Sequence, residues 1–201
     1  MQVATYVQEA HYRRGDDSYF ALAFASDSGS GSGTARDVCA ELGIPCFAFD
    51  IHQGFDACDA TDFPEAETFD FIWSHPPYWR QKLYADDPRD LSRSPTLDDF
   101  LRRYRHFIRN CSRSLKPGGK FAVLMGDYCD RDAGYVPLVY HTKRFAFEAG
   151  LSQHCTDIIR FSHGASSSKK VYRSSFIPGL HDVCMIFEKN TQSQPTKGIN
   201  Q

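Results

Sequence analysis

The sequence predicts an α/β fold, built as a doubly wound and largely parallel sheet with helices on both faces. Short apolar runs of strand length alternate along the chain with amphipathic segments of helix length, and this alternation is typical of parallel sheets covered by helices. Two of the apolar runs end in distinctive turns, a glycine-rich one at residues 27–34 and a proline-rich one at residues 74–79. Because ligands bind such sheets at the carboxyl ends of their strands, these two turns are the first candidates for a functional site.

The apolar runs determine where the strands are expected. The last two flank a loop rich in serine and lysine, and we expect them to form an antiparallel hairpin at the end of the domain. We expect strands over residues 19–26, 45–50, 69–74, 120–125, 154–161 and 180–188.

Three helices are expected, over residues 34–42, 96–115 and 136–149. Thr96 begins the longest of them, because Thr96 and Asp99 have the spacing of a capping box. Gly43 and Gly150 follow the other two helices at the position of a C-cap. Residues 116–119, Lys-Pro-Gly-Gly, end the long helix. We interpret its arginines as the outward face of an amphipathic helix: Arg102, Arg103, Arg105, Arg109 and Arg113.

Size and composition fit a single domain. A chain of 201 residues can bury one sizeable core, and we expect the domain to cover residues 1–189, followed by a flexible tail over residues 190–201. No apolar run reaches the length of about 20 residues that a membrane-spanning helix needs, and residues 1–5 show no secretory signal. The seven cysteines form no Cys-x-x-Cys pair, so we expect reduced thiols, no metal site and a cytoplasmic protein.

The glycine-rich turn has the chemistry of a cofactor-binding turn. Its glycines allow a ligand to approach the backbone closely, and Asp27 can accept hydrogen bonds from an ammonium or ribose group. Asp50 ends the next expected strand, where a carboxylate commonly binds ribose hydroxyls. Glycine turns also serve structure alone, and that interpretation stays open. The third glycine of the dinucleotide pattern is absent after Gly33, which disfavours a nicotinamide-dependent oxidoreductase.

Residues 27–34 resemble the D-P-[FM]-x-G-S-G-T form of the S-adenosylmethionine-binding motif of DNA amino-methyltransferases. Residues 31–34 match without change, whereas Ser28 and Gly29 replace the usual Pro-Phe. Residues 59–64 are similar to the D-A-x-D-L-P segment of that family. The resemblance implies a Rossmann-like class I methyltransferase with a mostly parallel seven-stranded sheet, and S-adenosyl-L-methionine as the cofactor. Further segments similar to the family's motifs lie at residues 115–119, 126–128 and 135–138.

The same resemblance implies which residues bind the cofactor. Asp27 and Gly31 would face its methionine part, Asp50 its ribose and Asp59 its adenine. The predicted cofactor site is completed by Gly33, Thr34 and Ala60.

Family members carry [DNS]-P-P-[YFW] where this sequence has His75-Pro76-Pro77-Tyr78. The lone pair of an exocyclic amine is delocalised into the aromatic ring. A polar acceptor and a backbone carbonyl must therefore hold its N–H groups while the nitrogen attacks the sulfonium methyl. The prolines fix φ near −65° and hold these acceptors in advance, while Tyr78 stacks on the base. We expect methyl transfer to adenine N6, with cytosine N4 as the alternative and with no metal or covalent intermediate.

His75 departs from the family pattern. A neutral imidazole can accept one hydrogen bond through its bare nitrogen but an imidazolium cannot, so activity that depends on His75 is expected to fall in mildly acidic solution. The departure leaves other interpretations open. One is an RNA or protein-glutamine methyltransferase, another is a catalytically silent nucleic-acid-binding subunit, and the third is a purely structural Pro-Pro loop with packed aromatic residues.

Recognition of the target is expected from two loops, over residues 80–94 and 162–175, since the motifs leave no room between them for a separate recognition domain. The net charge of −2 disfavours nonspecific coating of nucleic acid but allows a local basic face. Basic side chains with interleaved aromatic residues suit phosphate and base contacts, although a solvated hairpin tip is the alternative. The expected partners are DNA and either a specificity subunit or a second copy of the chain. The predicted target contacts are Trp79, Lys169, Lys170 and Arg173.

Overall fold

The computed structural model describes residues 21–25, 37–49, 51, 54–161 and 181–191, the first of these ranges as backbone alone. Its centre is a seven-stranded sheet in which the strand order is β2-β1-β3-β4-β9-β7, with β8 pairing with β9 as well. The strands are β1 (Ala21–Ala25), β2 (Cys46–Phe49), β3 (Phe69–His75), β4 (Leu115–Met125), β7 (Leu151–Gln153), β8 (Ile158–Phe161) and β9 (His181–Lys189).

The α/β architecture is confirmed, but the sheet is mixed rather than mostly parallel. Strands β1 to β4 run parallel to their neighbours. Strand β9 lies antiparallel to β4 on one side and to β7 and β8 on the other. Three of the six pairings are therefore antiparallel, because β9 returns along β8 and inserts between β4 and β7.

Apolar side chains cover both faces of the sheet, as expected of a doubly wound fold. Along β4, Phe121 and Val123 belong to one buried cluster, whereas Ala122 and Leu124 belong to another. This alternation follows from the two-residue period of a strand. The second cluster includes Cys39, from the helical residues 37–41.

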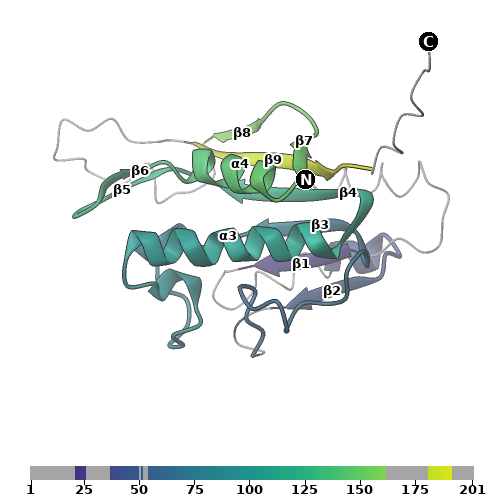
Figure 1. Ribbon diagram of the computed structural model, residues 1–201, viewed down its shortest axis with the longest axis horizontal. Coiled ribbons are helices and arrows are strands. Elements are labelled where there is room, and N and C mark those ends of the chain that lie inside the picture. The colour runs from purple at the N-terminus through teal and green to yellow at the C-terminus, as the bar shows by residue number, and fades with distance from the viewer. Residues whose placement is uncertain (1–20, 26–36, 50, 52–53, 162–180, 192–201) are drawn as a thin grey trace, which may run out of the picture.

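Helices α3 (Leu97–Ser114) and α4 (Leu138–Glu148) lie side by side over one face of the sheet (Figure 1). Thr96 is the N-cap of α3, and its hydroxyl accepts a hydrogen bond from the Asp99 amide at 3.1 Å. The two helices run in the same direction. The Tyr104 and Thr142 hydroxyls, each in the first half of its helix, lie 2.8 Å apart, and the Ser112 hydroxyl donates to the carbonyl of Ala149 at 2.9 Å near the helix ends. The side chains that α3 buries include Phe100, Tyr104, Phe107, Ile108 and Cys111.

The turn expected at residues 116–119 is present, but inside β4 rather than before it. Phe69 pairs with Leu115 while Phe71 pairs with Lys120, so residues 116–119 bulge out of the register. A Cβ atom on Gly119 would lie 2.8 Å from the Lys116 carbonyl oxygen, which makes glycine necessary at this position.

A hairpin of two short strands, β5 (Tyr128–Asp130) and β6 (Gly134–Val136), was not expected from the sequence. It projects from the body of the molecule beyond the beginning of α3 (Figure 1). Two short 3-10 turns, at Trp79–Gln81 and Leu91–Arg93, follow β3.

No helix in the described part of the chain combines the length and apolar character needed to cross a membrane. Among the same residues, no group of three or more His, Cys, Asp or Glu side chains is arranged to hold a metal ion.

Candidate active site

The chain order of the strands reverses between β1 and β3. Strand β1 lies between β2 on one side and β3 on the other, so successive strands are added in opposite directions from this point. Ala25 and His75, the last residues of β1 and β3, are Cα partners in neighbouring parallel strands. In open α/β sheets, ligands bind in the crevice at such a switch point, outside the carboxyl ends of the strands.

Many of the predicted contacts lie outside the described residues. For the cofactor these are Asp27, Gly31, Gly33, Thr34 and Asp50, and for the target Lys169, Lys170 and Arg173. Their roles stay predictions. The structure does show where β1 ends: the glycine-rich segment begins two residues after Ala25, which lies beside His75.

His75 and Tyr78 are held together at the end of β3. His75 Nε2 lies 3.3 Å from the hydroxyl oxygen of Tyr78, and the two rings meet edge to face with centroids 5.7 Å apart. Both side chains are half-buried, whereas Pro76 and Pro77 between them are buried. The prolines therefore form a rigid, covered step that presents two partly open polar rings.

Tyr78 lies against a glycine that directly follows β4. A Cβ atom on Gly126 would lie 3.1 Å from Tyr78 Cε2 and 3.4 Å from Asp182 Cβ. Burial, with a smaller contribution from the Asp182 charge, raises the pKa of Tyr78, so its hydroxyl stays protonated at neutral pH. A protonated hydroxyl can donate to a bare Nε2 of His75 or accept from a protonated one.

An ion pair stands beside Tyr78 on the β8–β9 hairpin. Asp182 is buried, with 4 % of its surface exposed, and accepts two hydrogen bonds from Arg160, at 2.9 Å from Nε and 2.6 Å from Nη2. Arg160 and Asp182 are register partners across the two strands. Neither residue was among those predicted from the sequence. In the sequence, this ion pair is indicated only by the opposite charges that stand at the facing ends of the last two expected strands.

Trp79 supports the loop from inside. Only 3 % of its surface is exposed, and its indole N–H donates to the carbonyl of Ser94 at 2.9 Å. The backbone φ of Trp79 is +47°, a conformation that is uncommon for a bulky residue and persists only where its surroundings hold it. The predicted contact between Trp79 and a target would require the indole to leave the core.

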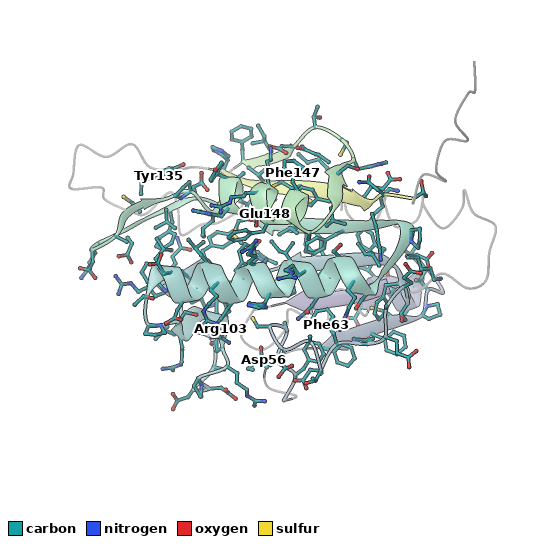
Figure 2. The ribbon with its side chains drawn as sticks, viewed as in Figure 1. Asp56, Phe63, Arg103, Tyr135, Phe147 and Glu148 are labelled. Atoms are coloured by element: carbon teal, nitrogen blue, oxygen red, sulfur yellow. The ribbon has the colours of Figure 1, made fainter. Side chains whose placement is uncertain are left out.

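Arg80, the next residue, connects this loop to the β5–β6 hairpin. Arg80 binds both carboxylate oxygens of Asp130, at 2.9 and 2.6 Å, and also Asp132 at 2.6 Å. Its guanidinium lies 4.4 Å from the centre of the Trp79 ring. The hairpin carries Tyr135 (Figure 2), whose side chain is exposed and whose hydroxyl donates to Asp127 at 2.5 Å.

The predicted adenine contact lies on a segment that packs along α3. Asn110 donates to the carbonyl of Ala57 at 3.2 Å, and Arg113 donates to that of Ala60 at 2.8 Å. The Asp59 carboxylate accepts hydrogen bonds from the backbone and the hydroxyl of Thr61, both at 2.8 Å. These bonds connect Asp59 and Ala60 to the C-terminal part of α3. The role of the two residues toward the cofactor stays a prediction.

No protein-family model matches the chain, and no curated protein matches it in sequence. Among solved structures, it is similar to a candidate DNA modification methylase from Thermus thermophilus, solved in complex with S-adenosyl-L-methionine. Sequence identity is 21 % and the TM-score is 0.48, over 71 % of this chain and 55 % of that one. The chain thus spans about half the length of this Thermus protein.

Two other similarities extend over nearly the whole chain. A candidate sarcosine dimethylglycine methyltransferase from Galdieria sulphuraria has 15 % identity and a TM-score of 0.54, covering 94 % of this chain and 86 % of that one. A SAM-dependent methyltransferase from Archaeoglobus fulgidus has 14 % identity and a TM-score of 0.51, covering 92 % and 94 %. At these identities the likeness concerns the fold alone. The chain has the fold of S-adenosyl-L-methionine-dependent methyltransferases.

Proposed function

We propose that this chain binds S-adenosyl-L-methionine and transfers its methyl group to an exocyclic amino nitrogen of a DNA base, adenine N6 in preference to cytosine N4. The observation that carries the proposal is the pairing of Ala25 with His75. It brings the end of β1, which precedes the glycine-rich segment by two residues in the sequence, beside the first residue of the His75–Tyr78 loop at the switch point of the sheet. The shared fold supports the cofactor, while DNA as the substrate rests on the resemblance of residues 27–34 and 75–78 to DNA amino-methyltransferases.

Each residue of the loop has a separate part in the proposed reaction. When bound, the cofactor would supply a methyl group on a sulfonium sulfur, which becomes a neutral thioether once the amine nitrogen has taken the methyl group, and the methylated amine would release one proton to solvent. His75 Nε2 and the carbonyl of Pro76 accept the two N–H bonds of the amine, which turns the nitrogen lone pair toward the methyl group. Tyr78 stacks on the base with the part of its ring that does not lie against Gly126. Because Tyr78 and His75 lie within hydrogen-bond distance, an incoming amine must replace the hydroxyl at Nε2.

A methylation assay with labelled cofactor tests this function, with unmodified DNA, RNA and ribosomal protein offered as separate acceptors. We expect label in DNA and a loss of roughly ten- to hundredfold in kcat/KM for Tyr78→Ala, from stacking worth about 1–3 kcal/mol. Tyr78→Phe is the matched control, because it keeps the ring and removes the hydroxyl. Full activity of Tyr78→Ala would contradict the assigned pocket, and label in RNA or protein alone would reassign the substrate.

His75 motivates one competing function, a nucleic-acid-binding subunit without activity. Calorimetry with S-adenosyl-L-methionine separates the two. The proposed enzyme binds the cofactor whether or not DNA is present, whereas a silent subunit would bind DNA with neither cofactor affinity nor turnover. A requirement for a specificity subunit or a homodimer would appear as activity that depends on an added partner or on protein concentration.

A further inference from the structure

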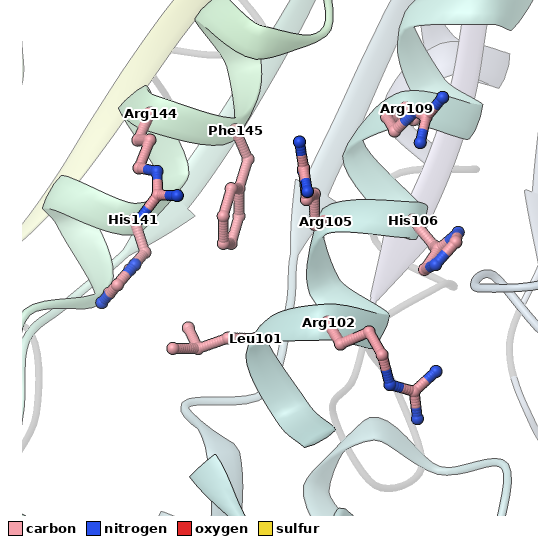
Figure 3. A pocket seen from close by; sticks show the side chains of 8 residues that line it. All are labelled: Leu101, Arg102, Arg105, His106, Arg109, His141, Arg144 and Phe145. Carbon is pink, nitrogen blue, oxygen red and sulfur yellow. The ribbon is translucent and has the colours of Figure 1, made fainter. Parts of the chain in front are cut away.

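A hollow lies between α3 and α4, on their solvent-facing side (Figure 3). Its volume is about 250 Å³. Leu101 and Phe145 form its apolar floor, and all its other lining residues can carry positive charge. They are Arg102, Arg105, His106, Arg109, His141 and Arg144.

Acidic side chains balance this charge only in part. Glu148 bonds to two of the arginines, Arg105 at 2.8 Å and Arg144 at 2.9 Å, and Asp99 pairs with Arg102 at 2.7 Å. Arg109 makes no ion pair with any residue of the described part of the chain. Two carboxylates therefore face four guanidinium groups, which leaves the hollow positive.

His141 adds a polar atom that the fold does not satisfy. Within the described structure, its Nδ1 is the one buried side-chain nitrogen or oxygen without a hydrogen-bond partner. The imidazole lies against Phe145, with ring centroids 5.7 Å apart. Buried polar atoms in native proteins are nearly always paired, but this nitrogen has almost no accessible surface, so a ligand in the open hollow would reach it only after the ring turns.

The size of the hollow indicates what kind of ligand fits. Pockets that enclose a whole small molecule usually measure about 300–1,000 Å³, and this one is smaller and open to solvent. It therefore suits a charged part of a larger ligand. Arginine forks match the geometry of phosphate oxygens and bind them bidentately.

We infer that the α3–α4 hollow binds backbone phosphates of the nucleic-acid substrate, at a site separate from the His75–Tyr78 loop. The inference rests on the proposed function for the identity of the polymer. Helix α3 follows the loop after β3, and α4 follows β4 and the β5–β6 hairpin. Both helices thus begin at the edge of the sheet where His75 lies, and a strand leaving the loop can continue along the groove between them.

Fluorescence anisotropy with a labelled duplex of about 20 base pairs, at several salt concentrations, tests the inference. We expect the double variant Arg105→Gln/Arg109→Gln to bind DNA of any sequence roughly tenfold more weakly. The slope of log affinity against log salt should fall by about 0.9 for each lost phosphate contact. Lys143→Gln is the matched control, because it removes a cation of α4 that pairs with Asp157 at 2.6 Å and does not line the hollow. A charge-preserving Arg105→Lys/Arg109→Lys variant should retain the salt slope.

Three results would overturn the inference. The first is unchanged affinity and slope in the double glutamine variant, once circular dichroism shows that it is folded. The second is a loss of log affinity in Lys143→Gln at least half as large as in the double variant, which is the share expected from removing one cation instead of two and would make the effect one of net charge. The third is stabilisation of the wild type by inorganic pyrophosphate, lost in the variant while DNA affinity stays the same, which would assign the hollow to a small phosphorylated ligand.

The labelled-methyl assay on the same proteins distinguishes this failure from failure of the proposed function. Wild-type protein that binds DNA through Arg105 and Arg109 but transfers no methyl group would refute the activity and keep the hollow. Wild-type protein that methylates DNA with no contribution from these arginines would refute the phosphate-binding role of the hollow and keep the proposed activity.

Discussion

The position of the Tyr78 ring depends on a residue without a side chain. Gly126 lets the ring approach the end of β4, and a methyl group there would lie 3.1 Å from Tyr78 Cε2. We predict that Gly126→Ala displaces the ring and lowers kcat/KM for methyl transfer by about tenfold, which corresponds to about 1.4 kcal/mol of transition-state stabilisation. Steady-state kinetics checks this. In a Tyr78→Ala background the same change should have no further effect, since the two residues act through one contact.

His75 predicts a pH dependence of the reaction. Protonation of the imidazole removes its acceptor nitrogen, so wild-type kcat/KM should fall as the solution becomes mildly acidic. His75→Asn supplies an acceptor that does not titrate and is one of the residues the family carries there. We predict that this variant keeps activity and flattens the acid side of the profile. If kcat/KM falls in acidic solution in the same way in the wild type and in His75→Asn, the group that titrates is not His75.

At the scale of elements, Arg80 connects the loop after β3 to the β5–β6 hairpin through ion pairs with Asp130 and Asp132. The Arg80 guanidinium holds the pKa of Asp130 well below its ordinary value, and the Asp130 side chain is only 8 % exposed. A carboxyl with a lowered native pKa contributes stability that is present above its unfolded pKa of about 3.9 and is lost as the pH falls through the native value. We predict that Asp130→Asn lowers the free energy of unfolding more at pH 7 than near pH 3. Urea unfolding at the two pH values measures this, and an equal loss at both would show that charge plays no part.

The elements themselves were predictable wherever the signal is local. Thr96 with Asp99 indicated the start of α3, and Gly150, with a φ of +81°, indicated the end of α4. One strand was expected over residues 154–161, and the structure has β8 there, over residues 158–161. Strand β7, at residues 151–153, lies ahead of the expected range and was missed. It pairs with residues 187–189 of β9, whereas β8 pairs with residues 181–184. Such a division is decided by a partner far along the chain and leaves no trace in local periodicity.

The candidate site follows the same rule. Residues 75–78 were predictable, because their chemistry is contiguous in sequence and follows an apolar run. Gly126, Arg160 and Asp182 were not, since only the sheet order brings them to Tyr78. The burial of Trp79 was equally hidden, because its bond to Ser94 depends on how the following loop folds back.

For the whole molecule, the proposed function predicts a coupling between cofactor and stability. A ligand that binds only the folded chain stabilises it by about 2.7 kcal/mol at a concentration of 100 Kd. We predict that S-adenosyl-L-methionine raises the melting temperature of the wild type and of His75→Ala alike, because His75 is assigned to the amine and not to the cofactor. Scanning calorimetry measures both. A thermal shift lost in His75→Ala would move that residue into the cofactor site.

The number of residues in β3 determines the position of His75 as much as the identity of those residues does. Each residue advances a strand by about 3.3 Å and reverses the side on which the next side chain emerges. A single insertion between Phe71 and Ser74 would therefore carry the imidazole past the end of β1 and turn it to the opposite face. Lineages that vary this strand should change it two residues at a time, or compensate with a matching bulge in β1.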